Sequence, residues 1–146
     1  ELSMVQIPAM LSRQTSLLEQ AAKIGVPVMI KKMQTMVCSD MLDAVEKVGR
    51  PDTIVCERGT FFGFGRNVID FEQVIAMQQT KHPVVVDVTH PATCYARAKG
   101  LAIAASALKV DGIFAECHEN PENAPSDGSK MLPLGQCFWQ LLFQVW

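Results

Sequence analysis

The chain has 146 residues, of which 49% are apolar and 19% charged, and its formal net charge is −2. This length and composition predict a single soluble domain over residues 1–146. The mildly acidic balance disfavours a nucleic-acid surface. No apolar stretch reaches the roughly 20 residues of a membrane span, and no signal-peptide pattern opens the chain. We therefore expect a cytoplasmic protein that binds neither membrane nor nucleic acid.

Short apolar runs alternate with segments of helical periodicity along the chain. In chain order the pattern predicts a strand at 4–7, a helix at 11–24, a strand at 28–30, a helix at 39–48, a strand at 53–56, a loop at 59–65, a helix at 71–79, a strand at 84–88, a helix at 96–109, a strand at 113–116, a polar loop at 119–129 and a helix at 132–145. These are five β/α units. They fit either an open doubly wound sheet or the larger part of a closed eight-stranded barrel, and periodicity leaves both open.

No dinucleotide-binding loop follows the first strand. The nearest pattern, Gly63-Phe64-Gly65, lies after the third strand and has no glycine three residues further on. We therefore expect no organic cofactor. The five cysteines include no CxxC pair, and a zinc site made from Cys56, Cys94, Cys117 and His118 matches no structural spacing.

Two cations close successive predicted strands, Lys31 after the second and Arg58 after the third. The carboxyl ends of parallel strands meet at one edge, so these side chains are expected to lie close together. A salt-bridged pair is the plain alternative for each cation alone. Together they favour a bound phosphate or carboxylate. Gln6 and Arg13, near the first strand, are weaker candidates for the same ligand.

One imidazole and two carboxylates follow the last two predicted strands. His90 ends the fourth strand, Glu116 ends the fifth, and Asp127 lies in the polar loop beyond it. Nitrogen and oxygen ligands of this kind suit a divalent metal ion, or an acid/base set without metal. His118 and Glu119 are rivals for the same role, and a lone histidine is more often structural.

The chain also contains a series of short motifs in a characteristic order. They are Gln6-Ile7-Pro8-Ala9, Arg13-Gln14-Thr15, Lys31-Lys32-x-Gln34, Cys56-Glu57-Arg58-Gly59-Thr60, Asp87-Val88-Thr89-His90, Asp111-Gly112-Ile113-Phe114, Glu116-x-His118, Ser126-Asp127-Gly128 and Leu132-Pro133-Leu134. In these motifs the chain resembles the 3-deoxy-D-manno-octulosonate 8-phosphate synthase family. The related 3-deoxy-heptulosonate phosphate synthases share the chemistry but are less similar in the first and fourth motifs.

The resemblance implies an α/β fold, a (β/α)8 TIM barrel, of which this chain carries about the last five β/α units. It implies a homotetrameric transferase that condenses phosphoenolpyruvate with D-arabinose 5-phosphate and water, in lipopolysaccharide or cell-wall sugar biosynthesis. The products are the eight-carbon sugar acid phosphate and inorganic phosphate. A loop that the family carries is expected to be missing between Cys94 and Tyr95.

Roles carry over from the family only at matching positions. Gln6, Lys31 and Arg58 match residues that bind phosphoenolpyruvate, and Arg13 matches one that reaches the pentose phosphate across a subunit boundary. His90, Glu116 and Asp127 match metal ligands. Catalytic roles are expected for Lys31 and His90, and Ser126 slightly favours the branch of the family that uses one divalent metal ion.

Two alternatives remain at this level. One is another phosphoenolpyruvate-sugar synthase, such as a 3-deoxy-heptulosonate phosphate synthase. The other is a truncated homologue without catalytic activity, suggested by the absence of counterparts to the first three strands of the family. Met33 and Thr93 depart from the residues that the family usually has there.

Overall fold

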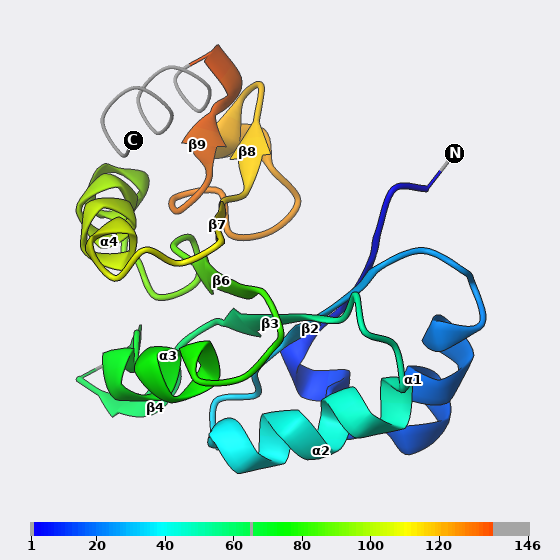
Figure 1. The fold of residues 1–146 in the computed structure, drawn as a ribbon. Helices are drawn as coiled ribbons and strands as arrows, with labels where there is room; N and C mark the ends of the chain where they lie inside the picture. The colour runs from blue at the N-terminus through cyan, green and yellow to red at the C-terminus, as the bar shows by residue number, and fades with distance from the viewer. Residues whose placement is uncertain (1, 65, 136–146) are drawn as a thin grey trace.

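The computed structural model describes residues 2–64 and 66–135. Its main sheet has five parallel strands in the order β1 (Val5–Ile7), β2 (Val28–Lys31), β3 (Ile54–Glu57), β6 (Val84–Asp87) and β7 (Gly112–Phe114) (Figure 1). The three middle strands are Val- and Ile-rich and almost wholly buried, as in parallel sheets that are covered on both faces.

The strand order decides between the two architectures that the sequence left open. Each strand of the main sheet pairs with the next one along the chain, from β1 to β7, and the order never reverses. A doubly wound sheet reverses its order at a switch point, whereas a barrel adds strands in one direction. The described residues therefore form an arc of a (β/α) barrel.

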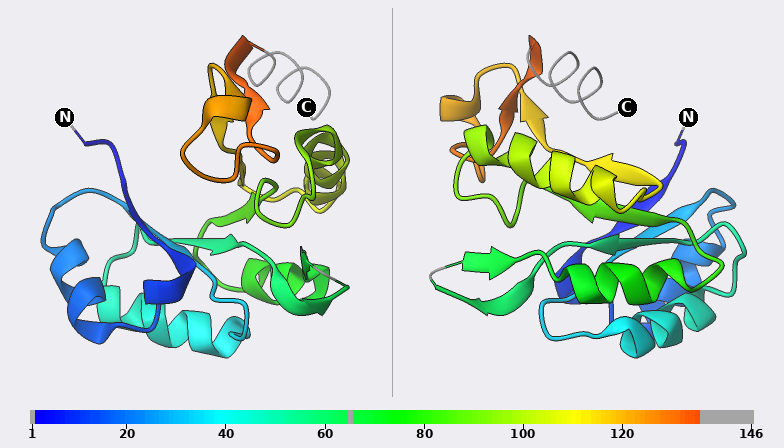
Figure 2. Two further views of the ribbon diagram at one scale, coloured as in Figure 1. Left: turned by 180° about the vertical axis from the view of Figure 1, so that it is seen from behind. Right: turned by 60° about the vertical axis from the view of Figure 1, so that its left-hand side comes forward.

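Within the described residues, four α-helices follow the outer side of this arc (Figures 1 and 2). They are α1 (Thr15–Ala22), α2 (Cys38–Val48), α3 (Phe71–Gln78) and α4 (Tyr95–Ala107). Each helix buries an apolar stripe against the sheet, represented by Leu18, Met41, Met77 and Ala98, all 0–1% exposed. The core thus lies between helices and strands, and the carboxyl ends of the strands are left to carry polar groups.

Helix ends show the local signals that place them. The carboxylate of Asp40 accepts a hydrogen bond from the Val37 amide at the start of α2, and Gly49 ends that helix with φ 65°. At the start of α3, Asp70 accepts a hydrogen bond from the Gln73 amide. No described helix has the length and apolar character that a membrane crossing requires.

Two predicted segments differ from the structure. Residues 59–65, predicted as a loop, contribute β4 (Thr60–Gly63), which pairs with β5 (Arg66–Val68) as an antiparallel hairpin. The predicted helix at 132–145 begins instead with the short strand β9 (Leu132–Pro133), which pairs with β8 (Cys117–His118). Residues 136–145 of that prediction lie outside the described part of the chain.

Candidate active site

A cavity of about 270 Å³ opens at the carboxyl ends of the parallel strands. It is lined by Gln6, Pro8, Ala9, Met10, Lys31, Arg58, His90, Glu116, Ser126 and Asp127. In barrels of this kind the loops at this end carry the active site. The structure therefore brings six of the seven predicted site residues around one space, although their roles remain predictions.

Lys31 is the last residue of β2, and its side chain is only 3% exposed. Its ammonium nitrogen lies 2.7 Å from Asp87 Oδ2 and 3.4 Å from the centre of the Phe114 ring. A carboxylate and an aromatic face both stabilise a buried cation. Both kinds of partner thus contact the Lys31 ammonium at the wall of the cavity.

Arg58 follows β3 and is half-buried at the same wall. Its Nη1 atom is buried and makes no hydrogen bond. A buried guanidinium nitrogen without an acceptor is costly, and an anion in the cavity would supply one. Arg58 therefore has the donor geometry that a phosphate or carboxylate ligand needs.

Asp87, the last residue of β6, connects the cation side of the cavity with His90. Its Oδ2 atom lies 2.7 Å from both Lys31 Nζ and His90 Nδ1, while Oδ1 accepts hydrogen bonds from the amides of Thr89 and His90. Burial alone would raise the pKa of Asp87. The hydrogen bond from His90 and the charge of Lys31 outweigh that effect and hold the pKa below its ordinary value.

His90, Glu116 and Asp127 are the described residues that could hold a metal ion, with ligand atoms that all lie within 4.8 Å of one another. The Nδ1 atom of His90 contacts Asp87, which leaves Nε2 turned toward Glu116 Oε1 at 3.6 Å. A carboxylate that holds the other ring nitrogen of a histidine is the usual support of a metal ligand. The donor set therefore fits a divalent cation.

The backbone orients the two carboxylates of this group. The Glu116 amide donates to Thr89 Oγ1 at 2.8 Å, which joins the end of β7 to that of β6. Asp127 adopts a left-handed φ of 51°, and its Oδ1 lies 3.2 Å from Lys130 Nζ. Such a φ is uncommon for a residue with a Cβ and marks a position that its surroundings fix.

Arg13 is the one predicted site residue that the structure does not place at this cavity. It is exposed, and its Nη1 lies 3.8 Å from Asp40 Oδ1, on the surface between α1 and α2. Because the resemblance implies a role across a subunit boundary, a position away from the other six residues is compatible with that expectation.

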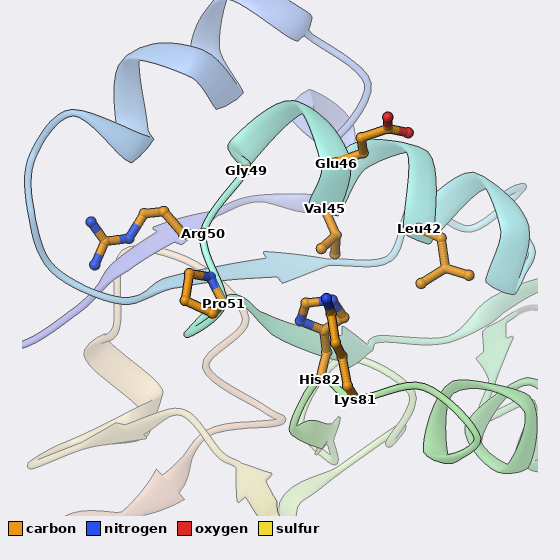
Figure 3. Close-up of a pocket in the computed structure, with 8 residues that line it drawn as sticks. All are labelled: Leu42, Val45, Glu46, Gly49, Arg50, Pro51, Lys81 and His82. Atoms are coloured by element: carbon orange, nitrogen blue, oxygen red, sulfur yellow. The ribbon is translucent and has the colours of Figure 1, made fainter.

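A larger pocket of about 400 Å³ lies at the opposite end of the strands (Figure 3). It is lined by Leu42, Val45, Glu46, Gly49, Arg50, Pro51, Lys81 and His82. Its polar side chains have partners outside the pocket or are exposed. Arg50 makes two hydrogen bonds to Asp52, His82 Nδ1 lies 3.2 Å from the Thr53 carbonyl, and Lys81 is exposed. This end of a barrel serves stability, so the smaller cavity remains the candidate site.

Three features of the site escaped sequence reasoning. From the sequence, Asp87 is identified only as a member of the Asp87-Val88-Thr89-His90 motif and is given no role of its own, although an acidic residue at the end of a Val-rich strand is unusual. Phe114 reads as an ordinary core aromatic. The third feature is an ion pair between Lys32 and Glu57, both 0% exposed, to which the motifs assign no role.

Comparison with known proteins supports the strand arrangement. The family model described as the DAHP synthetase I family matches residues 1–143. The solved structure of phospho-2-dehydro-3-deoxyheptonate aldolase (DAHP synthase) from Thermotoga maritima superimposes with a TM-score of 0.84 at 30% identity, over 89% of this chain and 40% of that chain. A truncated form of 3-deoxy-D-arabino-heptulosonate 7-phosphate synthase from Thermotoga maritima gives a TM-score of 0.84 at 29% identity, over 89% and 51% of the two chains.

The curated relatives have a different name from the family model and the solved structures. The chain is 43% identical to 2-dehydro-3-deoxyphosphooctonate aldolase of Bartonella bacilliformis and 42% identical to that of Rhizobium meliloti, in each case over 89% of this chain and 51% of the relative. The protein of the same name from Pisum sativum is 41% identical over the same shares. The chain therefore spans about half the length of the curated relatives it matches.

Proposed function

The chain belongs to the DAHP synthetase I family, and from this premise we propose that the protein condenses phosphoenolpyruvate with D-arabinose 5-phosphate. The reaction joins the methylene carbon of phosphoenolpyruvate to the aldehyde carbon of the sugar, consumes water and releases inorganic phosphate. The product is 3-deoxy-D-manno-octulosonate 8-phosphate. The single observation that carries the proposal is the convergence of Lys31, Arg58 and the His90 group on one cavity.

Phosphoenolpyruvate carries two anionic groups, a phosphate and a carboxylate, on a three-carbon frame. Lys31 and Arg58 supply two cations at the cavity wall, and Gln6 adds an amide. Arg58 offers a planar fork of donors with an unpaired Nη1, while Lys31 offers a point charge. We assign both cations and Gln6 to this substrate and, following the family resemblance, propose a catalytic role for Lys31.

The second half of the site, formed by the possible metal ligands, has the donor groups that would orient the aldehyde of the sugar and the attacking water. His90, Glu116 and Asp127 would hold one divalent metal ion, which when bound supplies charge stabilisation to an oxygen and orients it. His90 itself keeps its Nδ1 against Asp87. That contact fixes the ring so that Nε2 can hold a ligand or move a proton at the sugar's oxygen.

The name of the curated relatives favours the five-carbon sugar as co-substrate. This chain is 41–43% identical to the three curated relatives named above, the 2-dehydro-3-deoxyphosphooctonate aldolases, which are octulosonate synthases. It is 29–30% identical to the two heptulosonate synthases among the solved structures. The second candidate is a 3-deoxy-heptulosonate phosphate synthase, which takes erythrose 4-phosphate. The family model and the structural neighbours are its support.

We further propose that the full-length protein is a cytoplasmic homotetramer in lipopolysaccharide or cell-wall sugar biosynthesis. In that assembly Arg13 would reach the sugar phosphate bound in a neighbouring subunit. The support is its exposed position away from the cavity, where it is paired only loosely with Asp40 at 3.8 Å.

One assay tests the proposal. Full-length protein is incubated with phosphoenolpyruvate and either arabinose 5-phosphate or erythrose 4-phosphate, and released phosphate and product mass are measured. We expect an eight-carbon product with the first sugar. Faster turnover with erythrose 4-phosphate would favour the second candidate. Binding of phosphoenolpyruvate without turnover of either sugar would favour a non-catalytic homologue.

A further inference from the structure

Each of the two cavity cations has a sequence neighbour that lies behind the cavity wall, and these neighbours pair with each other. Lys31 and Arg58 line the cavity, whereas Lys32 and Glu57 do not and are both 0% exposed. Lys32 Nζ lies 3.4 Å from Glu57 Oε2. Successive residues of an extended chain point to opposite faces, which accounts for this second pair.

The ammonium group of Lys32 has two hydrogen-bond acceptors besides its ion-pair contact with Glu57. It donates to the Met36 carbonyl at 3.2 Å and to Thr60 Oγ1 at 3.0 Å. The Lys32 amide donates to the Cys56 carbonyl at 2.7 Å. Main chain and side chain together therefore join the end of β2 to the end of β3.

The carboxylate of Glu57 holds the backbone on both sides of Arg58. Its Oε1 atom accepts a hydrogen bond from the Gly59 amide at 2.8 Å and a longer one from the Asp70 amide at 3.4 Å. Arg58 lies between the two residues that the shorter bond connects. The Nη1 atom of Arg58 has no hydrogen-bond partner of its own, so the backbone that carries Arg58 contributes to placing its guanidinium.

A buried ion pair adds little net stability, because removing two charges from water offsets most of their attraction. The position of this pair points to another role. We propose that Lys32 and Glu57 are positioning residues that fix the distance between Lys31 and Arg58, so that both cations reach one substrate anion. The inference rests on the proposed function and deepens it, because the anion is phosphoenolpyruvate.

The test removes both charges together in the full-length protein. The double variant Lys32→Met/Glu57→Leu keeps the core apolar and leaves no unpaired charge. We expect the dissociation constant for phosphoenolpyruvate, measured by calorimetry, to rise by about tenfold or more, because small misplacements of binding groups are costly. The melting temperature should fall only modestly, because the Gly59 amide and the Met36 carbonyl lose their partners while the desolvation cost of two buried charges is removed. The KM for arabinose 5-phosphate should change little.

Two further variants sharpen the test. Lys32→Arg keeps the charge and should retain most of the affinity for phosphoenolpyruvate. The matched control is Arg50→Met/Asp52→Leu, which removes another close ion pair, with Nη2 and Oδ2 2.7 Å apart, that lies away from the cavity. This control should leave the dissociation constant unchanged.

A folded double variant that binds phosphoenolpyruvate as tightly as the wild type overturns the positioning role. A wild-type protein that does not bind phosphoenolpyruvate overturns the proposed function instead. If the double variant does not fold, Thr60→Val gives the deciding measurement, because it removes one contact of the Lys32 ammonium only. Weaker binding by this variant supports the inference, and unchanged binding contradicts it.

Discussion

Lys31 Nζ and Asp87 Oδ2 lie 2.7 Å apart and are both buried, although 56 residues separate them in the chain. The same oxygen contacts His90 Nδ1. Asp87 thus belongs to both halves of the candidate site, the cations and the proposed metal ligands. A substitution of this carboxylate should therefore affect both halves of the site.

The first prediction concerns the acid stability that Asp87 confers. Its folded pKa is below the unfolded value, so its contribution is complete above about pH 3.9 and is lost as the pH falls through the folded pKa. Wild-type protein should therefore lose unfolding free energy more steeply below about pH 4 than Asp87→Asn does. Denaturant titrations from pH 3 to 6 measure this. Asp43→Asn, on the exposed side of α2, is the control, and identical acid slopes would contradict the assignment.

The second prediction concerns Arg58. Arg58→Ala should lower kcat/KM by about 100-fold or more, because a donor to developing charge is lost in a partly buried site. The fold should survive, as judged by circular dichroism and melting temperature. Arg66→Ala is the matched control, since Arg66 is an exposed arginine on the neighbouring hairpin. Near-normal activity of Arg58→Ala would contradict the assignment of Arg58 to phosphoenolpyruvate binding.

The third prediction concerns the metal ion. A chelator should abolish activity, and one divalent cation should restore it. Calorimetric titration with Co²⁺ or Mn²⁺ should give one strong site, which His90→Ala removes. His118→Ala is the control, because that imidazole contacts Asn120 and is not a member of the ligand group. Activity that is indifferent to the chelator would indicate the branch of the family that works without metal.

The fourth prediction compares two glycines. Gly59 has φ 107°, and a Cβ there would lie 2.8 Å from Asn67 Cβ, so Gly59→Ala should destabilise the fold and weaken phosphoenolpyruvate binding through Arg58. Gly100, inside α4, has nothing within 4 Å of such a Cβ. Gly100→Ala should therefore stabilise the protein by about 0.5–1 kcal/mol. Thermal unfolding of both variants checks the opposite signs.

The fifth prediction tests the helix–sheet core. Leu18 is 0% exposed on α1, whereas Leu42 on α2 is 40% exposed. Leu18→Ala should cost about 2–5 kcal/mol of unfolding free energy. Leu42→Ala should cost about 1 kcal/mol or less. Equal losses in urea titrations would show that the buried stripe of α1 is wrongly assigned.

The alternation of strands and helices was predictable because it depends on local patterns. The Val-rich run before Asp87 and the periodic apolar residues of α2 each specify their own element. The choice of a barrel over a doubly wound sheet was not predictable from periodicity, since it depends on which strands pair. Only the motifs, through their resemblance to a family, indicated the barrel in advance.

The hairpin shows a second limit of local reasoning. Glycine and aromatic residues at 59–65 predict a loop, yet Thr60 pairs with Val68 in a ladder. Gly63 is required there, because a Cβ would meet the Arg66 carbonyl. The loop prediction is therefore wrong for residues 60–63, because the partner strand that completes the hairpin is not marked by any apolar run.

The candidate site was predictable where strand ends carry charge, and six of seven residues lie at one cavity. The pairing of Lys32 with Glu57 was not predictable from the sequence, because each of them looks like a solvated neighbour of a functional residue. Their contact depends on the lateral pairing of β2 with β3, which brings Lys31 opposite Cys56. Such a relationship exists only in three dimensions.

The ring of Phe114 under the Lys31 ammonium makes the fifth strand of the sheet a partner of a cation that the second strand supplies. An aromatic face stabilises a cation that lies over it. Replacing Phe114 by leucine would therefore remove this stabilisation without altering any charged group. An uncharged side chain thus helps to set the electrostatic character of the cavity wall.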